Sequence, residues 1–289
     1  MKRFQVMWFI MLGLLCTISV AQAGSVNLEY KYKLSEGCKY KITMSITTGL
    51  PGSDRIYTAN INGDIAEKVI GIKKDGSIEL AIMLKNMKAS YKLIQDVGNI
   101  RSIPDKTYII TIAKSGKIVS KNNDSSSSLD KVTGGFDLMG SSIHGVVLPE
   151  EAVSVGQSWD NKSSILNGVA EVNAKSTLLS DSEQVGDQTA AKIKNLLDAK
   201  LDIATVLAAI EKEKDFNKYY NDALKDIKGT IGVAGTTVYY FSPLQGKLLK
   251  SEGNYKINSS ISFPKTKEYK QLPASMNVTY DITITVTKQ

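Results

Sequence analysis

The sequence predicts a mainly β protein with one large, curved, half-barrel-like antiparallel sheet and one long amphipathic helix packed on its apolar face. Three observations predict this fold. Apolar and polar residues alternate along several segments, turn residues separate these segments, and one segment has apolar residues at helical spacing. The chain has 289 residues, 42% hydrophobic and 22% charged, which is typical of a globular protein and excludes a disordered or collagen-like one.

The first 23 residues have the pattern of a secretory signal peptide. Two basic residues, Lys2 and Arg3, precede an apolar run at 6–20, and an A-x-A cleavage pattern ends at Ala23, directly before Gly24. The run is shorter than the roughly 20 residues that a membrane-spanning helix needs. We therefore predict cleavage between Ala23 and Gly24, an exported chain that is periplasmic or extracellular, and no membrane span after cleavage.

The two cysteines lie on either side of this cleavage site. Cys16 would leave with the signal peptide; attachment of a lipid to it is the alternative, which Leu15 disfavours because such sites normally have a small residue before the cysteine. Cys38 would remain alone and unable to form an internal disulfide, so we expect a partly buried, unreactive thiol.

Period-two alternation predicts strands at 39–46, 78–85 and 276–287. The last of these has six apolar residues alternating with six polar ones, which predicts a strand about 40 Å long. Long strands with one apolar face predict a sheet that is covered on one side only. Turn residues predict hairpin turns or bulges at 51–54, 62–64, 74–76, 114–116 and 244–246.

A polar, low-complexity stretch that begins at 122 predicts the main division of the chain. We expect an N-terminal β half at 24–121, a polar break and crossover at 122–148, and a C-terminal β half at 149–289. Short patterns recur across the break: Gly37 and Gly156 each stand three residues before an aromatic residue, and Gly-Lys precedes two aliphatic residues at 116–119 and 246–249. These patterns indicate two related halves; the alternative is chance, because glycine before a strand is common.

The segment between Asp202 and Gly229 has apolar residues at helical spacing, which predicts an amphipathic helix at about 203–228. Asp202 is the expected N-cap and Gly229 the expected C-terminal stop. The polar side of this helix mixes acidic and basic residues, which favours docking on the sheet over lying on a membrane surface.

The basic charge balance does not indicate a nucleic-acid partner. The formal net charge of +7 falls to +5 when Lys2 and Arg3 leave with the signal peptide. The chain has 33 lysines and only three arginines, whereas nucleic-acid sites favour arginine. Lysines alternate with other residues, as in Tyr30-Lys31-Tyr32-Lys33, which predicts a solvated sheet face at that segment.

The sequence contains no motif that points to catalysis. Its single histidine, His144, allows no multi-histidine metal site, and the nucleophile-elbow, zinc-protease, Cys-x-x-Cys and phosphate-loop motifs are missing. We therefore expect a protein that is not an enzyme and that has no cofactor and no metal.

Two motifs carry a resemblance to known proteins. A Leu-x-x-Gly-x-x-Tyr opening at 34–40 is followed by Leu148-Pro149-x-x-x-Val153-x-Val155-Gly156-x-x-Trp159. This arrangement resembles uncharacterised exported bacterial β-protein families, domains of unknown function in which such a motif opens the C-terminal half. The resemblance implies a lipoprotein-carrier-like fold and a structural role for the motif residues Leu148, Pro149, Val153, Val155, Gly156 and Trp159. The predicted helix at 203–228 departs from that pattern.

These observations together predict an exported, non-enzymatic envelope protein that binds an apolar or amphipathic ligand, such as a lipid, between sheet and helix. Two alternatives stay open. The protein is a structural or interaction module whose partner is another envelope protein, or it is a hydrolase with an unrecognised site.

Overall fold

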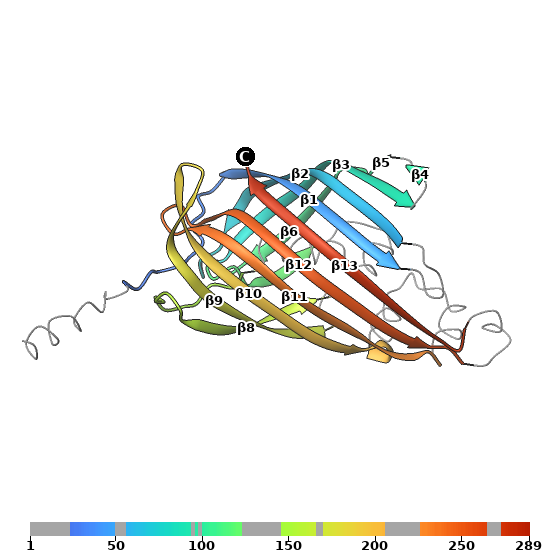
Figure 1. Ribbon diagram of the computed structural model, residues 1–289. Coiled ribbons are helices and arrows are strands. Elements are labelled where there is room, and N and C mark those ends of the chain that lie inside the picture. Colours follow the sequence, from blue (N-terminus) through green and yellow to red (C-terminus); the bar gives the residue numbers. More distant parts are fainter. Residues whose placement is uncertain are drawn as a thin grey trace, which may run out of the picture.

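All the strands of the computed structural model belong to one sheet (Figure 1). The structure describes residues 24–49, 56–93, 96–97, 100–122, 146–165, 170–205, 226–264 and 273–289. Its strands are β1 (Gly37–Gly49), β2 (Ile56–Ile72), β3 (Ile78–Leu93), β4 (Asp96–Val97), β5 (Arg101–Ser102), β6 (Lys106–Ile112), β7 (Ile118–Asn122), β8 (Ser158–Ile165), β9 (Ala170–Val185), β10 (Gln188–Asp202), β11 (Lys228–Ser242), β12 (Lys247–Ser262) and β13 (Ser275–Lys288).

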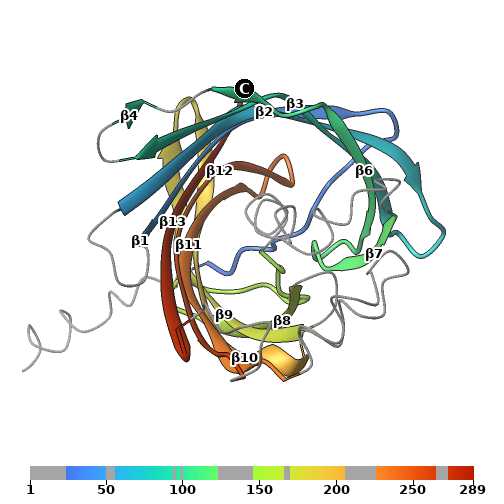
Figure 2. The same cartoon turned by 90° about the vertical axis from the view of Figure 1, so that its right-hand side faces the viewer.

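The sheet consists of two antiparallel meanders that are joined by the first and the last strand. The strand order is β7-β6-β3-β2-β1-β13-β12-β11-β10-β9-β8, and the short strands β4 and β5 pair with β3. The junction runs from the pair Tyr40–Lys288 to the pair Thr48–Tyr280. The sheet curls so that its inner face surrounds the N-terminal part of the described chain (Figure 2). The mainly β, antiparallel prediction is therefore confirmed.

One-sided burial explains the alternation seen in the sequence. In β1, Tyr40, Ile42 and Met44 point inward and are at most 4% exposed, while the neighbouring Lys39 and Lys41 are exposed. The same pattern holds in β3 from Ile78 to Leu84 and in β13 from Ile282 to Val286. The inner face thus forms the core, and the outer face is polar.

The N-terminal segment, residues 26–36, crosses the inner face instead of forming the solvated strand predicted at Tyr30–Lys33. Tyr30 is 3% exposed, and its ring packs edge-on against Phe241 with the ring centroids 5.1 Å apart. The backbone N–H of Tyr30 donates to the carbonyl of Lys114, 3.0 Å away, and that of Lys31 to the carbonyl of Gly246, 3.1 Å away. The alternation there reflects contacts with the end of the sheet that holds the turns at Lys114 and Gly246. We call this end of the inner face the plugged end.

We expect Gly246→Ala to destabilise the protein by about 2–4 kcal/mol, because two penalties combine. Gly246 has a φ of +64°, which costs a non-glycine residue about 1–2 kcal/mol. A methyl group there would also overlap the backbone nitrogen and side chain of Lys31. Gly186 is a matched control, since its φ is +62° but no atom lies within 4 Å of an added Cβ. Urea unfolding should show a clearly larger loss for Gly246→Ala, and equal losses would contradict the packing of Lys31 on this turn.

The structure does not support the long helix predicted at 203–228. Among the described residues, only 203–205 are helical. The predicted N-cap agrees with the structure, because the Asp202 carboxylate accepts a hydrogen bond from the backbone N–H of Ala204 at 2.7 Å. Residues 206–225 lie outside the described residues. The C-terminal stop at Gly229 is wrong, because Gly229 belongs to β11 and pairs with Ile261 of β12. Pairing with β12 satisfies the backbone there and overrides the local helical spacing.

The predicted turns agree with the structure where it describes them. Residues 74–76, 114–116 and 244–246 form turns, and 62–64 is a bulge inside β2. The predicted turn at 51–54 lies outside the described residues, as does nearly all of the polar break at 122–148.

Candidate ligand-binding face

The plugged end of the inner face is filled by side chains. Leu28 and Tyr30 of the N-terminal segment pack with Tyr40, Tyr239 and Phe241, all at most 3% exposed. Burial raises the pKa of Tyr30, Tyr40 and Tyr239 above the usual value for tyrosine, so these phenols stay neutral at physiological pH. This end therefore offers no room for a ligand.

An ion pair fastens the N-terminal segment to the sheet. The Lys247 ammonium group donates to the Glu36 carboxylate, and the Lys247 side chain is only 8% exposed, whereas the Glu36 side chain is 33% exposed. Burial raises the pKa of Glu36, but the hydrogen bonds from Lys247 and from the backbone N–H of Lys33 outweigh it, so the pKa is lowered overall. The pair lies at the plugged end, where it is a structural contact between the N-terminal segment and β12.

A row of polar side chains crosses the middle of the inner face, and we call it the polar row. Its members come from five neighbouring strands: Asn161 (β8), Ser176 (β9), Asn195 (β10), Thr237 (β11) and Tyr255 (β12). All are at most 9% exposed. The Asn161 amide donates to Ser176 Oγ at 3.1 Å, Ser176 Oγ donates to Asn195 Oδ1 at 3.5 Å, and the hydroxyl groups of Thr237 and Tyr255 are 2.6 Å apart.

Two glycines let the Tyr255 ring lie against the sheet. A Cβ on Gly235, its partner on β11, or on Gly253 of its own strand would overlap the Tyr255 ring. A glycine inside a strand typically marks such a close approach. The ring therefore covers backbone and places its hydroxyl on Thr237, instead of projecting across the inner face.

Beyond the polar row the inner face is largely apolar and several of its side chains are only half buried, whereas Val233 and Leu201 there are buried; we call this part the apolar half. Its members include Ile46 on β1, Leu197 on β10, Ile231 on β11, Ile257 on β12, and Val278 and Tyr280 on β13. Equivalent positions at the plugged end, such as Ile42 and Val286, are fully buried. Among the described residues, every inward position of these five strands beyond the row is uncharged. The described part of the chain thus leaves an apolar surface partly uncovered.

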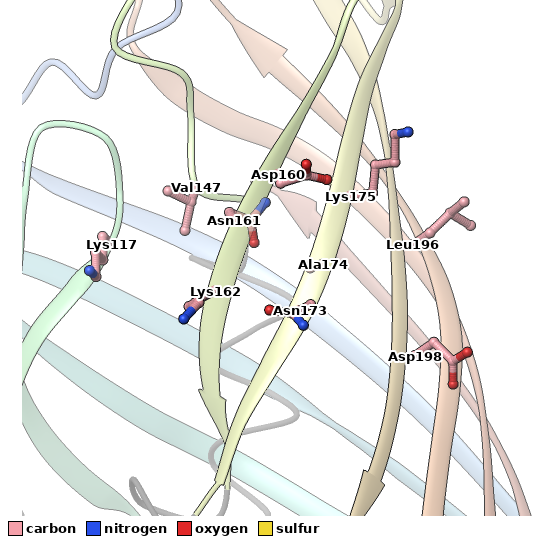
Figure 3. A pocket seen from close by; sticks show the side chains of 10 residues that line it. All are labelled: Lys117, Val147, Asp160, Asn161, Lys162, Asn173, Ala174, Lys175, Leu196 and Asp198. Atoms are coloured by element: carbon pink, nitrogen blue, oxygen red, sulfur yellow. The ribbon is translucent and has the colours of Figure 1, made fainter.

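A hollow of about 790 Å³ lies where the two edge strands approach each other (Figure 3). We call it the seam pocket. Asn161 and Ala174 of the inner face line it, together with Lys117, Val147 and the outward side chains Asp160, Lys162, Asn173, Lys175, Leu196 and Asp198. Asn161 therefore links the polar row to an open space at the edge of the sheet.

The motif residues at 148–159 hold this edge together. The Leu148 N–H donates to the carbonyl of Ser115 next to β7, and the Trp159 indole N–H of β8 donates to the carbonyl of Val147, both at 2.7 Å. Val153 forms a bridge with Val26. Gly156, at a φ of +87°, donates to the carbonyl of Leu178.

The other predicted residues do not join a site. Pro149 is half-buried and Val155 is exposed, while Gly24 is exposed at the start of the described chain. Ala23 and His144 lie outside the described residues. Cys38 is a free, buried thiol in the core.

The described ranges hold neither a candidate metal site nor a candidate membrane-spanning helix. They contain no cluster of three or more histidine, cysteine or acidic side chains that suits a metal ion. None of the helices found there has the length and hydropathy required to cross a membrane.

Sequence reasoning missed the polar row altogether. Its members stand among other polar residues in β8 (SWDNKSSI) and next to lysines in β10. β10 contains a weak signal. Asn195 stands two residues from both Ile193 and Leu197, so the period of two places it on the same face as these apolar residues. Only the strand register shows that these polar side chains point inward and meet.

Comparisons with known proteins find similarity in fold only. The sequence matches no family model and no curated protein. A solved structure described as "lipid-protein interactions in lipovitellin" is similar over 90% of this chain, with a TM-score of 0.50 and 9% sequence identity. This chain spans only 25% of that protein. DynF from the dynemicin biosynthesis pathway of Micromonospora chersina aligns over 91% of this chain and 85% of its own length, with 8% identity and a TM-score of 0.24, which is too low to support an argument.

Proposed function

We propose that the protein is an exported, non-enzymatic binding protein of the cell envelope whose apolar half takes an apolar or amphipathic ligand. The observation that carries the proposal is the apolar half itself. Its inward side chains are of the same kind as those at the plugged end, yet several of them are only half buried. Apolar surface of this kind gains about 25 cal/mol per Å² when it is removed from water, and a concave apolar face is typical of small-molecule sites.

Two further points support a lipid-like ligand. The fold similarity is to a protein whose structure was described for its lipid–protein interactions, and the sequence begins with a signal-peptide pattern. The patterns at 34–40 and 148–159 resemble exported families, and the residues at 148–159 make structural contacts at the edge of the sheet, as a binding protein without catalytic groups requires.

Binding of the fluorescent dye N-phenyl-1-naphthylamine to the purified, delipidated protein tests the proposal. We expect fluorescence enhancement with the unmodified chain and at least about tenfold weaker binding by Ile257→Glu, because a carboxylate on the inner face disfavours an apolar ligand. Asn258→Glu is the matched control, since the next residue on β12 points outward and is exposed.

Leu197→Trp supplies a second variant that adds no charge. Its larger ring should fill part of the apolar half and weaken dye binding, while urea unfolding shows that the sheet remains folded. The proposal would be wrong if the unmodified protein did not bind the dye, or if both inner-face variants bound it as well as Asn258→Glu.

A further inference from the structure

The chemistry of the ligand's polar end can be inferred from the polar row, if the apolar half binds a ligand as proposed above. Asn161 lies on β8 opposite Ala174 of β9, which in turn lies opposite Leu197 of the apolar half. It also lines the seam pocket (Figure 3). A ligand chain along the apolar half would therefore have one end close to Asn161.

Asn161 has an unused hydrogen-bond acceptor. Its amide nitrogen donates to Ser176 Oγ, and Ser176 Oγ donates to Asn195 Oδ1, which leaves the Asn161 amide oxygen without a partner in this chain of bonds. Asn161 Oδ1 has no hydrogen-bond partner among the described residues, although the residue is only 9% exposed. A buried acceptor without a donor is costly, and a ligand N–H or O–H would remove that cost.

An anionic ligand head does not match the unpartnered acceptor of the polar row. The five members of the row are neutral, and the inward positions of β10 to β13 and β1 beyond the row, all of them described, carry no charge. Lys117, Lys162 and Lys175 line the seam pocket beside Asn161, but an ionised carboxylate or phosphate there would offer Asn161 Oδ1 another acceptor instead of a donor.

We propose that the ligand is a neutral, hydroxyl-bearing lipid whose chain lies along the apolar half and whose hydroxyl group donates to Asn161 Oδ1. Long-chain alcohols and monoacylglycerols belong to this class. The site selects its ligand by one specific acceptor, in addition to apolar area.

Displacement of N-phenyl-1-naphthylamine by three ligands of equal chain length tests this inference. The probes are dodecan-1-ol, dodecyl methyl ether, which lacks the O–H donor, and dodecanoate, which is ionised at about pH 8. We expect the alcohol to bind roughly tenfold more tightly than the ether and more tightly still than the carboxylate.

Two variants separate the role of Asn161 from general packing. Asn161→Leu keeps a similar shape but has no acceptor, so the preference for alcohol over ether should disappear while dye binding persists. Asn173→Leu changes an outward side chain of the same pocket and should keep the preference. Equal binding of alcohol and ether by the unmodified protein, tight binding of dodecanoate, or an unchanged preference in Asn161→Leu would overturn the inference and leave the proposed function standing. Failure of the dye itself to bind would overturn both.

Discussion

Tyr30→Ala is expected to lower the free energy of unfolding by about 3–5 kcal/mol, the range for deleting a large buried aromatic side chain. Tyr30 is 3% exposed, contacts Phe241 edge-on and stacks with Tyr32 at 6.1 Å between ring centroids. It also covers Gly116, where a Cβ would overlap its ring. Its removal would leave a void between the N-terminal segment and the sheet. Urea unfolding followed by tryptophan fluorescence measures the change.

Tyr91→Ala is the matched control, because Tyr91 lies on β3 and is 52% exposed. We expect a loss of less than about 1 kcal/mol for this variant. A similarly small loss for Tyr30→Ala would mean that the N-terminal segment does not pack on the inner face as described.

Removing Glu36 should cost far more stability than removing Lys247, although the two side chains form one ion pair. Glu36→Ala leaves an ammonium group that is 8% exposed without its counter-charge, and we expect a loss of about 2–4 kcal/mol. Lys247→Met replaces the cation by an apolar side chain of similar length, while the Glu36 carboxylate is 33% exposed and can be hydrated. The expected loss for Lys247→Met is below about 1 kcal/mol, measured by urea unfolding at neutral pH.

The contribution of Glu36 should also depend on pH. Its pKa is lowered in the folded protein, so the stability that it contributes is fully present above the ordinary pKa of about 4.5 and is lost as the pH falls further, through the folded pKa. The difference in unfolding free energy between the unmodified protein and Glu36→Ala should therefore shrink below about pH 4.5. Glu29→Ala removes an acid of the same segment that is 42% exposed, and its effect should be small at every pH. A pH-independent difference for Glu36→Ala would contradict the ion pair.

The sequence was sufficient to predict the strands at 39–46, 78–85 and 276–287, because one face of the sheet is buried and the other faces solvent. In β13, Ile282, Ile284 and Val286 are buried while the threonines between them are exposed, so the period of two is directly visible. The pairing of β1 with β13 was not predictable in the same way. It joins residues from opposite ends of the chain, and no local pattern specifies a partner strand.

The polar row and the N-terminal segment show where alternation misleads. Asn195 and Thr237 point inward although both are polar, because hydrogen bonds with neighbouring strands satisfy them. Tyr30 and Tyr32 alternate with lysines as in a strand, but the backbone N–H groups of Tyr30 and Lys31 donate to turns at Lys114 and Gly246. The helix proposed from spacing at 203–228 fails at its C-terminal end for a related reason, since β12 supplies partners that the local sequence does not reveal.

The pairing of β1 with β13 has a consequence for how the molecule is made. Synthesis releases β1 well before β13, so the two meanders cannot pair until β13 has been made. Contacts between such distant segments close slowly, because the entropy of a very long loop must be lost before the pairing is gained. In the interval β1 presents an open row of backbone donors and acceptors to other chains. Until β13 pairs with it, the free edge of β1 is therefore the place where two copies of the chain are most prone to join.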